Sequence, residues 1–182
     1  MKRILYIAYL LLALSLCGRA QETTDAIRIA CVGNSITYGA GIDNRDRDSY
    51  PAVLGQMLGR KYDVRNYGFS ARTMLMKGDL PYMKEQMFRD VQTFNPNIVV
   101  MKLGTNDSKP YNWVHKKDFA RDMQTMINTF RDLPAKPTIY LCYPAKAYLS
   151  QYGINDSVIT NGIIPIIDRL AAQNKLEIID LH

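Results

Sequence analysis

Strand-like and helix-like segments alternate along most of this chain, and that alternation restricts the folds open to it. Five short runs, mostly apolar or alternating, are typical of strands, and they span 27–32, 62–67, 98–101, 137–143 and 176–179. No two neighbouring runs are joined by a hairpin signal, so we expect parallel strands with right-handed crossovers. The pattern therefore predicts an α/β fold with helices on both faces of one sheet.

The segments between the strands carry helical spacing or loop composition. Helices are predicted after Ser49, and over about 81–94, 117–131 and 156–173, the last with Pro165 at a kink or at the start of a second part. The charged stretch 43–49 is predicted to be an exposed loop. The run 98–101 is the most apolar of the mature chain and is expected to be a central strand, buried on both faces.

Three of the strands end in a glycine followed by polar residues. Gly33 precedes Ser35, Gly68 ends the second strand, and Gly104 precedes Asn106. Ligands of open α/β sheets bind at the carboxyl ends of the strands, so these turns are expected to face one site. Each residue taken alone has an ordinary structural explanation, as a helix cap or a turn residue.

Together, the three turns contain the groups that acyl transfer by a serine needs. Ser35 offers a hydroxyl nucleophile on a turn that follows a rigid strand. The backbone N–H groups of Ser35 and Gly68 and the side-chain amide of Asn106 could donate hydrogen bonds to the oxyanion that forms in the reaction. We therefore treat Ser35, Gly68 and Asn106 as the candidate catalytic residues.

These motifs resemble the blocks of the SGNH (GDSL-type) hydrolase family. Gly33–Thr37 is similar to its first block, Asn66–Gly68 with Ser70 to its second, and Gly104–Asp107 to its third and most specific block. The resemblance extends from Ile27 to the end of the sequence. It implies a flavodoxin-like three-layer α/β/α sandwich, whose five-stranded parallel sheet has the order 2-1-3-4-5. It also implies Ser35 as nucleophile and Gly68 and Asn106 as oxyanion donors.

Two features depart from the family pattern. Asn34 stands where the family usually has Asp, and as a near-isostere it keeps an acceptor oxygen. The fourth block, Asp-x-x-His, is absent, because Asp180–His182 has a shorter spacing and lies at the strand end. The other histidine, His115, is expected to be solvated in a polar loop. We expect the catalytic His and Asp to lie beyond this sequence, and the chain as given to be close to inactive.

The first twenty residues have the pattern of a cleaved signal peptide. A basic start is followed by the apolar stretch 4–16, which is too short to cross a bilayer, and by Gly18–Ala20 as a cleavage site. The alternative is an uncleaved anchor. We expect 21–182 to be one esterase domain, incomplete at its C-terminus, that is exported to the periplasm or beyond without staying in the membrane.

Cysteine and charge content narrow the chemistry further. Cys31 and Cys142 lie on two strands that have one other strand between them in the expected order. This places the two cysteines too far apart for a disulfide, so both are predicted to be free thiols. The net charge is +6, partly from the leader, and no basic stripe suggests nucleic acid. We predict no metal and no cofactor. A nucleotide- or flavin-binding reading of 33–41 fails because the loop matches neither phosphate-binding motif.

The expected function is a secreted serine esterase that hydrolyses O-acyl esters, above all O-acetyl esters of carbohydrates. Aromatic residues suited to stacking on sugar rings lie in the loops near the expected site: Tyr111, Trp113, Tyr148 and Tyr152. The partner would be a small-molecule or glycan ester, and the sequence is silent on oligomeric state. The alternatives are a non-catalytic carbohydrate-binding descendant of the fold and a general short-chain carboxylesterase or lysophospholipase.

Overall fold

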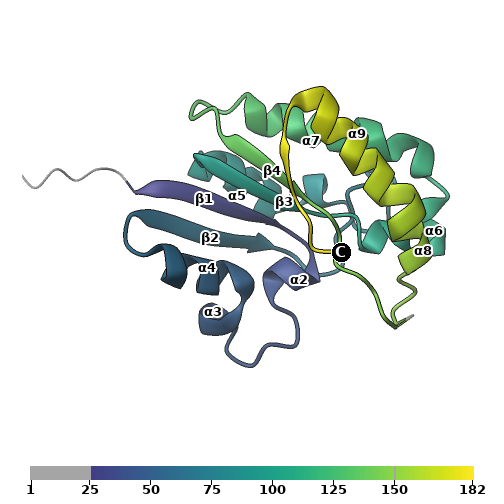
Figure 1. Ribbon diagram of the computed structural model, residues 1–182, viewed down its shortest axis with the longest axis horizontal. Coiled ribbons are helices and arrows are strands. Elements are labelled where there is room, and N and C mark those ends of the chain that lie inside the picture. The colour runs from purple at the N-terminus through teal and green to yellow at the C-terminus, as the bar shows by residue number, and fades with distance from the viewer. Residues whose placement is uncertain (1–25, 150) are drawn as a thin grey trace, which may run out of the picture.

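A computed structural model describes residues 26–149 and 151–182 of the protein (Figure 1). Its strands form one parallel sheet in the order β2-β1-β3-β4-β5, which confirms the predicted fold class and strand order. The strands are β1 Ile27–Gly33, β2 Tyr62–Gly68, β3 Ile98–Lys102, β4 Thr138–Cys142 and β5 Glu177–Ile179. The predicted signal peptide lies outside the described residues.

Helices connect successive strands, as parallel pairing requires. They are α2 Ser35–Tyr38, α3 Arg45–Asp48, α4 Tyr50–Leu58, α5 Gln86–Phe94, α6 Pro110–Trp113, α7 Phe119–Arg131, α8 Asp156–Val158 and α9 Ile164–Asn174. Short 3-10 turns are η1 Tyr82–Lys84, η2 Asn106–Ser108 and η3 Lys116–Asp118, and η4 Ile159–Ile163 is a π-helical turn. Figure 1 shows α5, α7 and α9 on one side of the sheet and α4 on the other.

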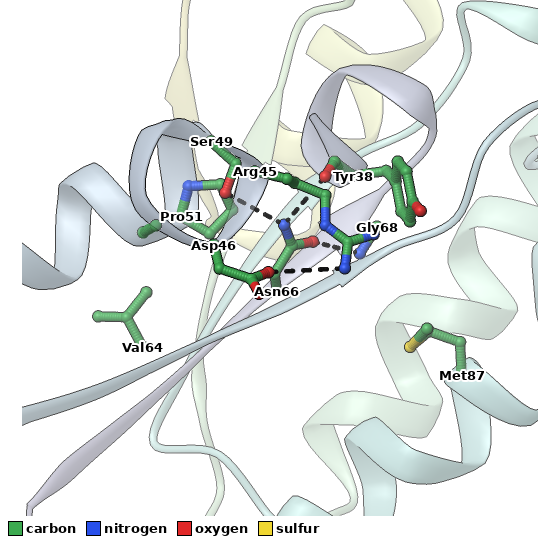
Figure 2. A pocket seen from close by; sticks show the side chains of 10 residues that line it. Tyr38, Arg45, Asp46, Ser49, Pro51, Val64, Asn66, Gly68 and Met87 are labelled. Atoms are coloured by element: carbon green, nitrogen blue, oxygen red, sulfur yellow. Dashed lines mark hydrogen bonds and ion pairs between the residues drawn. The ribbon is translucent and has the colours of Figure 1, made fainter. Parts of the chain in front are cut away.

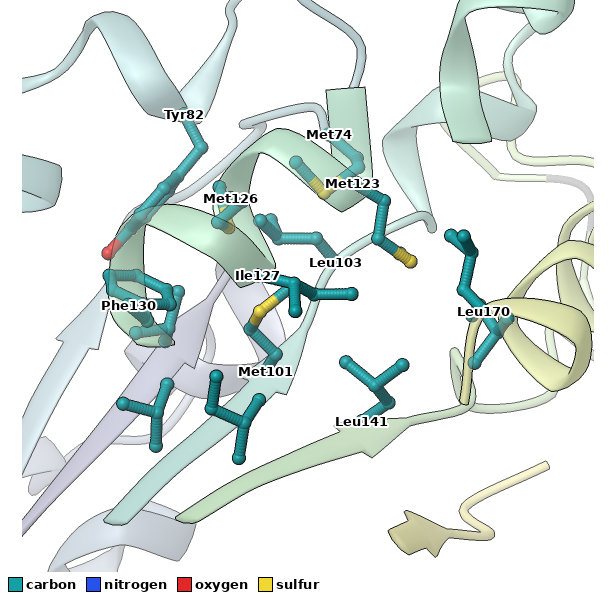
Figure 3. Packing of buried hydrophobic residues seen from close by; sticks show 14 of the residues in the cluster. Met74, Tyr82, Met101, Leu103, Met123, Met126, Ile127, Phe130, Leu141 and Leu170 are labelled. Atoms are coloured by element: carbon teal, nitrogen blue, oxygen red, sulfur yellow. The ribbon is translucent and has the colours of Figure 1, made fainter. Parts of the chain in front are cut away.

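The main core lies between the sheet and the layer of α5, α7 and α9. Met101 of β3 and Leu141 of β4 pack there beneath Ile127 and Phe130 of α7 and Leu170 of α9 (Figure 3). These side chains are at most 4% exposed, and burial of each apolar side chain contributes about 1.5–3 kcal/mol before entropy is counted. This rigid layer fixes β3, and therefore the turn that carries Asn106.

The opposite face of the sheet is covered less completely, so the prediction that 98–101 is buried on both faces is wrong. Val99 and Met101 point toward α7 and are buried, whereas Ile98 and Val100 are only half-buried. The reason is that α4 packs mainly against β2 at the sheet edge. Val100 therefore lines an apolar cavity of about 560 Å³ between α4 and the ends of β3, β4 and β5.

Two helical segments differ from the prediction, and a third differs only in its capping residue. The charged stretch predicted as a loop contains the exposed helix α3. The helix predicted over 81–94 is divided, because Glu85 is extended between η1 and α5. The helix predicted from 156 is capped by the side chain of Asn155, which accepts from the Val158 N–H, rather than by Asp156 or Ser157. Pro165 lies in the first turn of its second part, which is one of the two predicted positions.

The two cysteines of the described residues are buried and free, as predicted. Cys31 lies on β1 and Cys142 on β4, and β3 separates these strands. Burial raises the pKa of the Cys31 thiol to about 12 and that of Cys142 to about 11. A thiol with so high a pKa stays protonated at neutral pH, so neither group is a nucleophile.

Candidate functional site

The register of the sheet brings the three predicted turns to one edge. Gly33, the last residue of β1, pairs with Gly68 of β2 on one side and with Lys102 of β3 on the other. Ser35 follows Gly33 by two positions, and Asn106 follows Lys102 by four. The sequence-predicted residues therefore share the carboxyl edge of three adjacent strands, where open α/β sheets bind their ligands.

The turn that carries Ser35 folds back tightly onto the strand before it. A Cβ atom on Gly33 would lie 2.0 Å from the Thr37 hydroxyl oxygen, so this position needs a glycine. Asn34 is fully buried, and its Oδ1 accepts a hydrogen bond of 3.2 Å from the Ile36 N–H. Asn34 thus supplies the acceptor expected of it and caps α2. Ser35, the first residue of α2, remains partly exposed to solvent.

Gly68 lies directly against the turn that carries Ser35. A Cβ atom at Gly68 would lie 2.1 Å from the backbone nitrogen of Tyr38 and 2.5 Å from the carbonyl carbon of Thr37. The absence of a side chain therefore lets α2 and the end of β2 meet. The next residue continues the junction, because the Phe69 N–H donates to the Gly33 carbonyl over 2.9 Å.

The Gly68 N–H, predicted to donate to an oxyanion, has a partner within the protein. It donates to Asn66 Oδ1 over 2.9 Å, while Asn66 Nδ2 donates to the Tyr38 carbonyl over 3.3 Å. Figure 2 shows Asn66 between Gly68, Tyr38 and Ser49, at a cavity of about 350 Å³. Arg45 also lines this cavity, with its guanidinium carbon 4.1 Å from the centre of the Tyr38 ring.

Asn106 is held from two sides beyond the end of β3. The residue is 4% exposed, and its Nδ2 donates to the Arg72 carbonyl over 3.0 Å. The backbone carbonyl of Asn106 accepts from Asn112 Nδ2 over 2.9 Å, which holds the main chain at this position. An amide nitrogen carries two hydrogens, so one remains after the bond to Arg72. The side chain is thus fixed in orientation and keeps one donor for a ligand.

Sequence reasoning missed a buried acid beside Asn106. Asp107 is 0% exposed, and its two oxygens accept from the N–H groups of Met74 and Leu75 over 3.0 and 2.8 Å. Burial raises the pKa of Asp107 to about 6, against the lowering effect of those hydrogen bonds. Its place next to Asn106 was a signal in the sequence, but its partners lie more than thirty residues earlier in the chain.

Lys102 is the second buried charged group that the sequence did not reveal. It is 2% exposed, and its Nζ has no hydrogen-bond partner among the described residues. Burial lowers the pKa of this amine to about 8. Lys102 lines the apolar cavity next to Cys142 and Ile36. Val53, Leu54 and Met57 of α4 line the same cavity.

Neither histidine is hydrogen-bonded to Ser35. His182 Nδ1 lies 3.2 Å from the Pro144 carbonyl, and its Nε2 lies 3.1 Å from the Thr160 hydroxyl. Asp180 accepts from the backbone N–H of His182 over 2.9 Å rather than from an imidazole. His115 is partly exposed in the segment before η3. His182 and Asp180 are thus bonded to groups other than Ser35, and the absence of the fourth block from this sequence stays a prediction.

The loop aromatics have different environments. Tyr148 and Tyr152 are each 84% exposed, and Tyr111 is 56% exposed. Trp113 instead packs against the Phe119 ring, with ring centres 5.8 Å apart, and against Gly162. Trp113 is therefore partly buried by packing, whereas the three tyrosines are exposed, and stacking of any of the four on a sugar stays a prediction.

Within 26–149 and 151–182, no three His, Cys, Asp or Glu residues are grouped so as to hold a metal ion. In the same ranges, no helix has both the length and the apolar character needed to cross a membrane.

Comparison with known proteins places this geometry in a family. The chain is 50% identical to an acetylxylan esterase of Xylanibacter ruminicola over 87% of its length, and it spans only 36% of that relative. An aryl esterase of M. smegmatis has a similar structure, with a TM-score of 0.69, 22% identity, and 85% of this chain and 84% of the other covered.

A second solved structure has the same fold. Est24, a carbohydrate acetylesterase from Sinorhizobium meliloti, has a TM-score of 0.68 and 17% identity, with 84% of this chain and 83% of the other covered. Residues 31–182, which include all three candidate turns, match the GDSL-like lipase/acylhydrolase family. The chain therefore belongs to the GDSL-like lipase/acylhydrolase family.

Proposed function

We propose that this protein is an esterase that removes O-acetyl groups from carbohydrates, with Ser35 as nucleophile. The observation that carries the proposal is the register of Gly33 with Gly68 and Lys102, which puts Ser35, Gly68 and Asn106 at one sheet edge. Membership of an acylhydrolase family supports the reaction type. The name of the 50% identical relative, an acetylxylan esterase, supports the acetyl group and the carbohydrate.

In the proposed reaction, Ser35 Oγ attacks the carbonyl carbon of the ester, and a base takes the hydroxyl proton. The carbonyl electron pair moves to oxygen, and the oxyanion accepts hydrogen bonds from the N–H groups of Ser35 and Gly68 and from Asn106 Nδ2. Collapse of this intermediate breaks the bond to the sugar oxygen, which takes the proton. Water then attacks the acetylated Ser35 in the same way and releases acetate.

The Gly68 donor must change partner during this reaction. Its N–H is bonded to Asn66 Oδ1, so the oxyanion has to share or replace that acceptor. Asn66 can remain in place through its other bonds, to the Tyr38 carbonyl and the Ser49 hydroxyl. The exchange replaces a neutral acceptor with a charged one, which forms the stronger hydrogen bond.

The base is proposed to come from an Asp-x-x-His block that follows β5 in the full-length protein. His182 is bonded to Pro144 and Thr160, and Asp180 to the backbone of His182. The relative named above is much longer than this chain, which leaves room for such a block there. We further propose that the enzyme is exported, on the strength of the signal-peptide pattern in 1–20.

A carbohydrate substrate also suits the loop after β4. Tyr148 and Tyr152 are almost fully exposed, and Lys146 Nζ lies 5.6 Å from the centre of the Tyr148 ring. Exposed aromatic side chains of this kind often mark binding surfaces, and a tyrosine ring can stack on the apolar face of a sugar.

The proposal is tested by acetate release from acetylated xylan and p-nitrophenyl acetate in the full-length protein. Ser35→Ala should lower kcat by about 10⁴-fold or more on both substrates, because it removes the nucleophile. Ser157→Ala, which changes an exposed serine on α8, is the matched control and should keep full activity. Equal activity of Ser35→Ala and wild type would refute the assignment.

A second candidate function is carbohydrate binding without hydrolysis. The observation in its favour is that neither histidine contacts Ser35. The same assay separates the two: a full-length protein that binds acetylated xylan but releases no acetate is a binding module. A general short-chain carboxylesterase would instead hydrolyse p-nitrophenyl acetate and leave the polysaccharide acetylated.

A further inference from the structure

The loop between β2 and η1, residues 69–81, is fastened by side chains from a later part of the chain. Asp107 accepts from the Met74 and Leu75 N–H groups, and Asp122 of α7 accepts from the Met76 N–H over 2.8 Å. Asp107 and Asp122 are 0% and 4% exposed. Two carboxylates thus hold three consecutive N–H groups of one loop.

The two acids differ in how their charge is balanced. Asp122 also pairs with the guanidinium of Arg121 over 3.1 Å. Asp107 has no ion-pair partner among the described residues, and the charged group that raises its pKa by repulsion is another acid, Asp79. Burying a carboxylate that has only amide N–H partners costs free energy of folding, because the charge loses its hydration without gaining a cation. A contribution to stability therefore does not explain this residue by itself.

The loop that Asp107 holds also orients Asn106. The Arg72 carbonyl accepts from Asn106 Nδ2, and Arg72 precedes Met74 by two residues. Asn106 and Asp107 are adjacent on η2, and both are hydrogen-bonded to the loop 69–81. Asp107 fixes the loop, the loop places the Arg72 carbonyl, and that carbonyl turns the Asn106 amide.

Gly68 lies at the near end of the same loop. The carboxyl end of β2 leads directly into it, and the Tyr82 hydroxyl at the far end donates to the Tyr67 carbonyl over 2.6 Å. Two of the proposed oxyanion donors are therefore linked to this loop: Asn106 Nδ2 is hydrogen-bonded to it, and Gly68 directly precedes it. Asp107 holds the middle of the same loop.

We propose that Asp107 is a positioning residue that sets the orientation of the oxyanion donors by holding Met74 and Leu75. The inference rests on the proposed esterase function, in which Asn106 Nδ2 and the Gly68 N–H stabilise the oxyanion. Asp107 itself touches no substrate. Its loss should weaken stabilisation of the transition state and leave substrate binding nearly unchanged, so kcat should fall while KM stays constant.

The first test compares Asp107→Asn with Asp122→Asn in the full-length protein, with p-nitrophenyl acetate as substrate. Both changes remove a carboxylate that holds the same loop, but Asp122 is not next to Asn106. Removing a whole oxyanion donor costs about 10²–10³ in kcat, so misorienting one should cost about 10–100-fold in Asp107→Asn. Asp122→Asn should keep kcat within about threefold of wild type.

Thermal unfolding of both variants separates positioning from simple destabilisation. We expect a lower kcat in Asp107→Asn even when the assay is run well below the melting temperatures of both proteins. Equal losses of kcat in the two variants, or a KM that rises while kcat is kept, would overturn the proposal.

Side-chain amide NMR measures the environment of Asn106 Nδ2 directly and does not depend on the enzymatic activity of the variants. The ¹⁵N resonances of Asn106 Nδ2 should move in Asp107→Asn and stay in Asp122→Asn. If Asp107→Asn fails to fold, the same resonances in the wild type should move as Asp107 is protonated by acid. Unmoved resonances would overturn the positioning role. If ester hydrolysis by the wild-type protein does not depend on Ser35, the proposed function is wrong. The NMR comparison then still decides whether Asp107 orients Asn106.

Discussion

At the scale of single residues, two glycines allow the candidate site to exist. Gly33 and Gly68 are paired across β1 and β2, and each lies against the backbone or side chains of α2. A side chain at either position would push α2 away from the sheet edge. The sequence signalled both positions as strand-ending glycines, although not what they would touch.

We predict that Gly68→Ala lowers both stability and activity. The added Cβ would meet the backbone of Thr37 and Tyr38, which cannot move without displacing Ser35. Overpacking of this kind costs about 1–3 kcal/mol. Urea denaturation should show that loss. Gly55→Ala, in the middle of α4 where a Cβ would be 3.4 Å from the nearest atom, is the control and should be neutral or stabilising. Equal stability of both variants would contradict the prediction.

Lys102 supplies a prediction about stability and pH. Burial lowers its pKa from an ordinary value near 10.5 to about 8, so the folded protein gives up this proton more readily than the unfolded chain. Between those values the unfolded state binds more protons, and the free energy of unfolding should rise with pH. At pH 7 the charged amine costs stability, by about 3 kcal/mol for this shift.

Lys102→Met should therefore raise the free energy of unfolding at pH 7 by up to about 3 kcal/mol and remove the rise between pH 8 and 10. Urea denaturation at several pH values measures both effects. Lys84→Met, which changes an exposed lysine, should have little effect on either. A destabilised Lys102→Met would mean that the amine has a favourable partner.

At the scale of elements, the sequence predicted the strands better than the segments that follow them. An apolar run marked β1 and an alternating run marked β2, each with a glycine at its end, and the spacing of apolar residues marked α7. The short helix α3 was missed because four charged residues carry no apolar period. The division of the helix at Glu85 was missed because Tyr82, fully buried, is drawn into the core through contacts distant in sequence.

In the candidate site too, local sequence patterns identified some residues, whereas contacts between residues distant in sequence could not be predicted. Ser35, Gly68 and Asn106 could be named because each lies at the end of a strand or within four residues of it. Asp107 could not be placed, since its partners Met74 and Leu75 belong to a loop with no regular pattern. Side-chain contacts across the sheet edge depend on the tertiary fold, which local propensity does not encode.

The loop after β4 is the element that should decide whether the substrate is a polymer. The double variant Tyr148→Ala/Tyr152→Ala should raise KM for acetylated xylan several-fold and leave hydrolysis of p-nitrophenyl acetate unchanged, because only the polymer is long enough to stack on both rings. Met57→Ala, an 80% exposed apolar residue on α4, is the control. Unchanged KM for the polysaccharide would remove these tyrosines from the substrate site.

At the scale of the whole molecule, the sheet is packed unequally on its two faces. The side of α5, α7 and α9 contains the main core and holds β3 and β4 in place. The side of α4 contains the apolar cavity with Lys102 and Cys142. The carboxyl edge of the sheet lies between these layers, so the rigid core fixes Asn106 from one side while α2 carries Ser35 at the same edge.

The most direct test of the central claim is to identify the residue that reacts with an active-site phosphonate ester. Full-length protein is treated with the p-nitrophenyl ester of a methylphosphonate, digested with trypsin and examined by mass spectrometry. Cleavage after Arg28 and Arg45 gives the peptide 29–45, in which Ser35 is the serine. We predict a single adduct, on Ser35, and no adduct in the Ser35→Ala variant. An adduct on another residue, or none in a protein that hydrolyses esters, would contradict it.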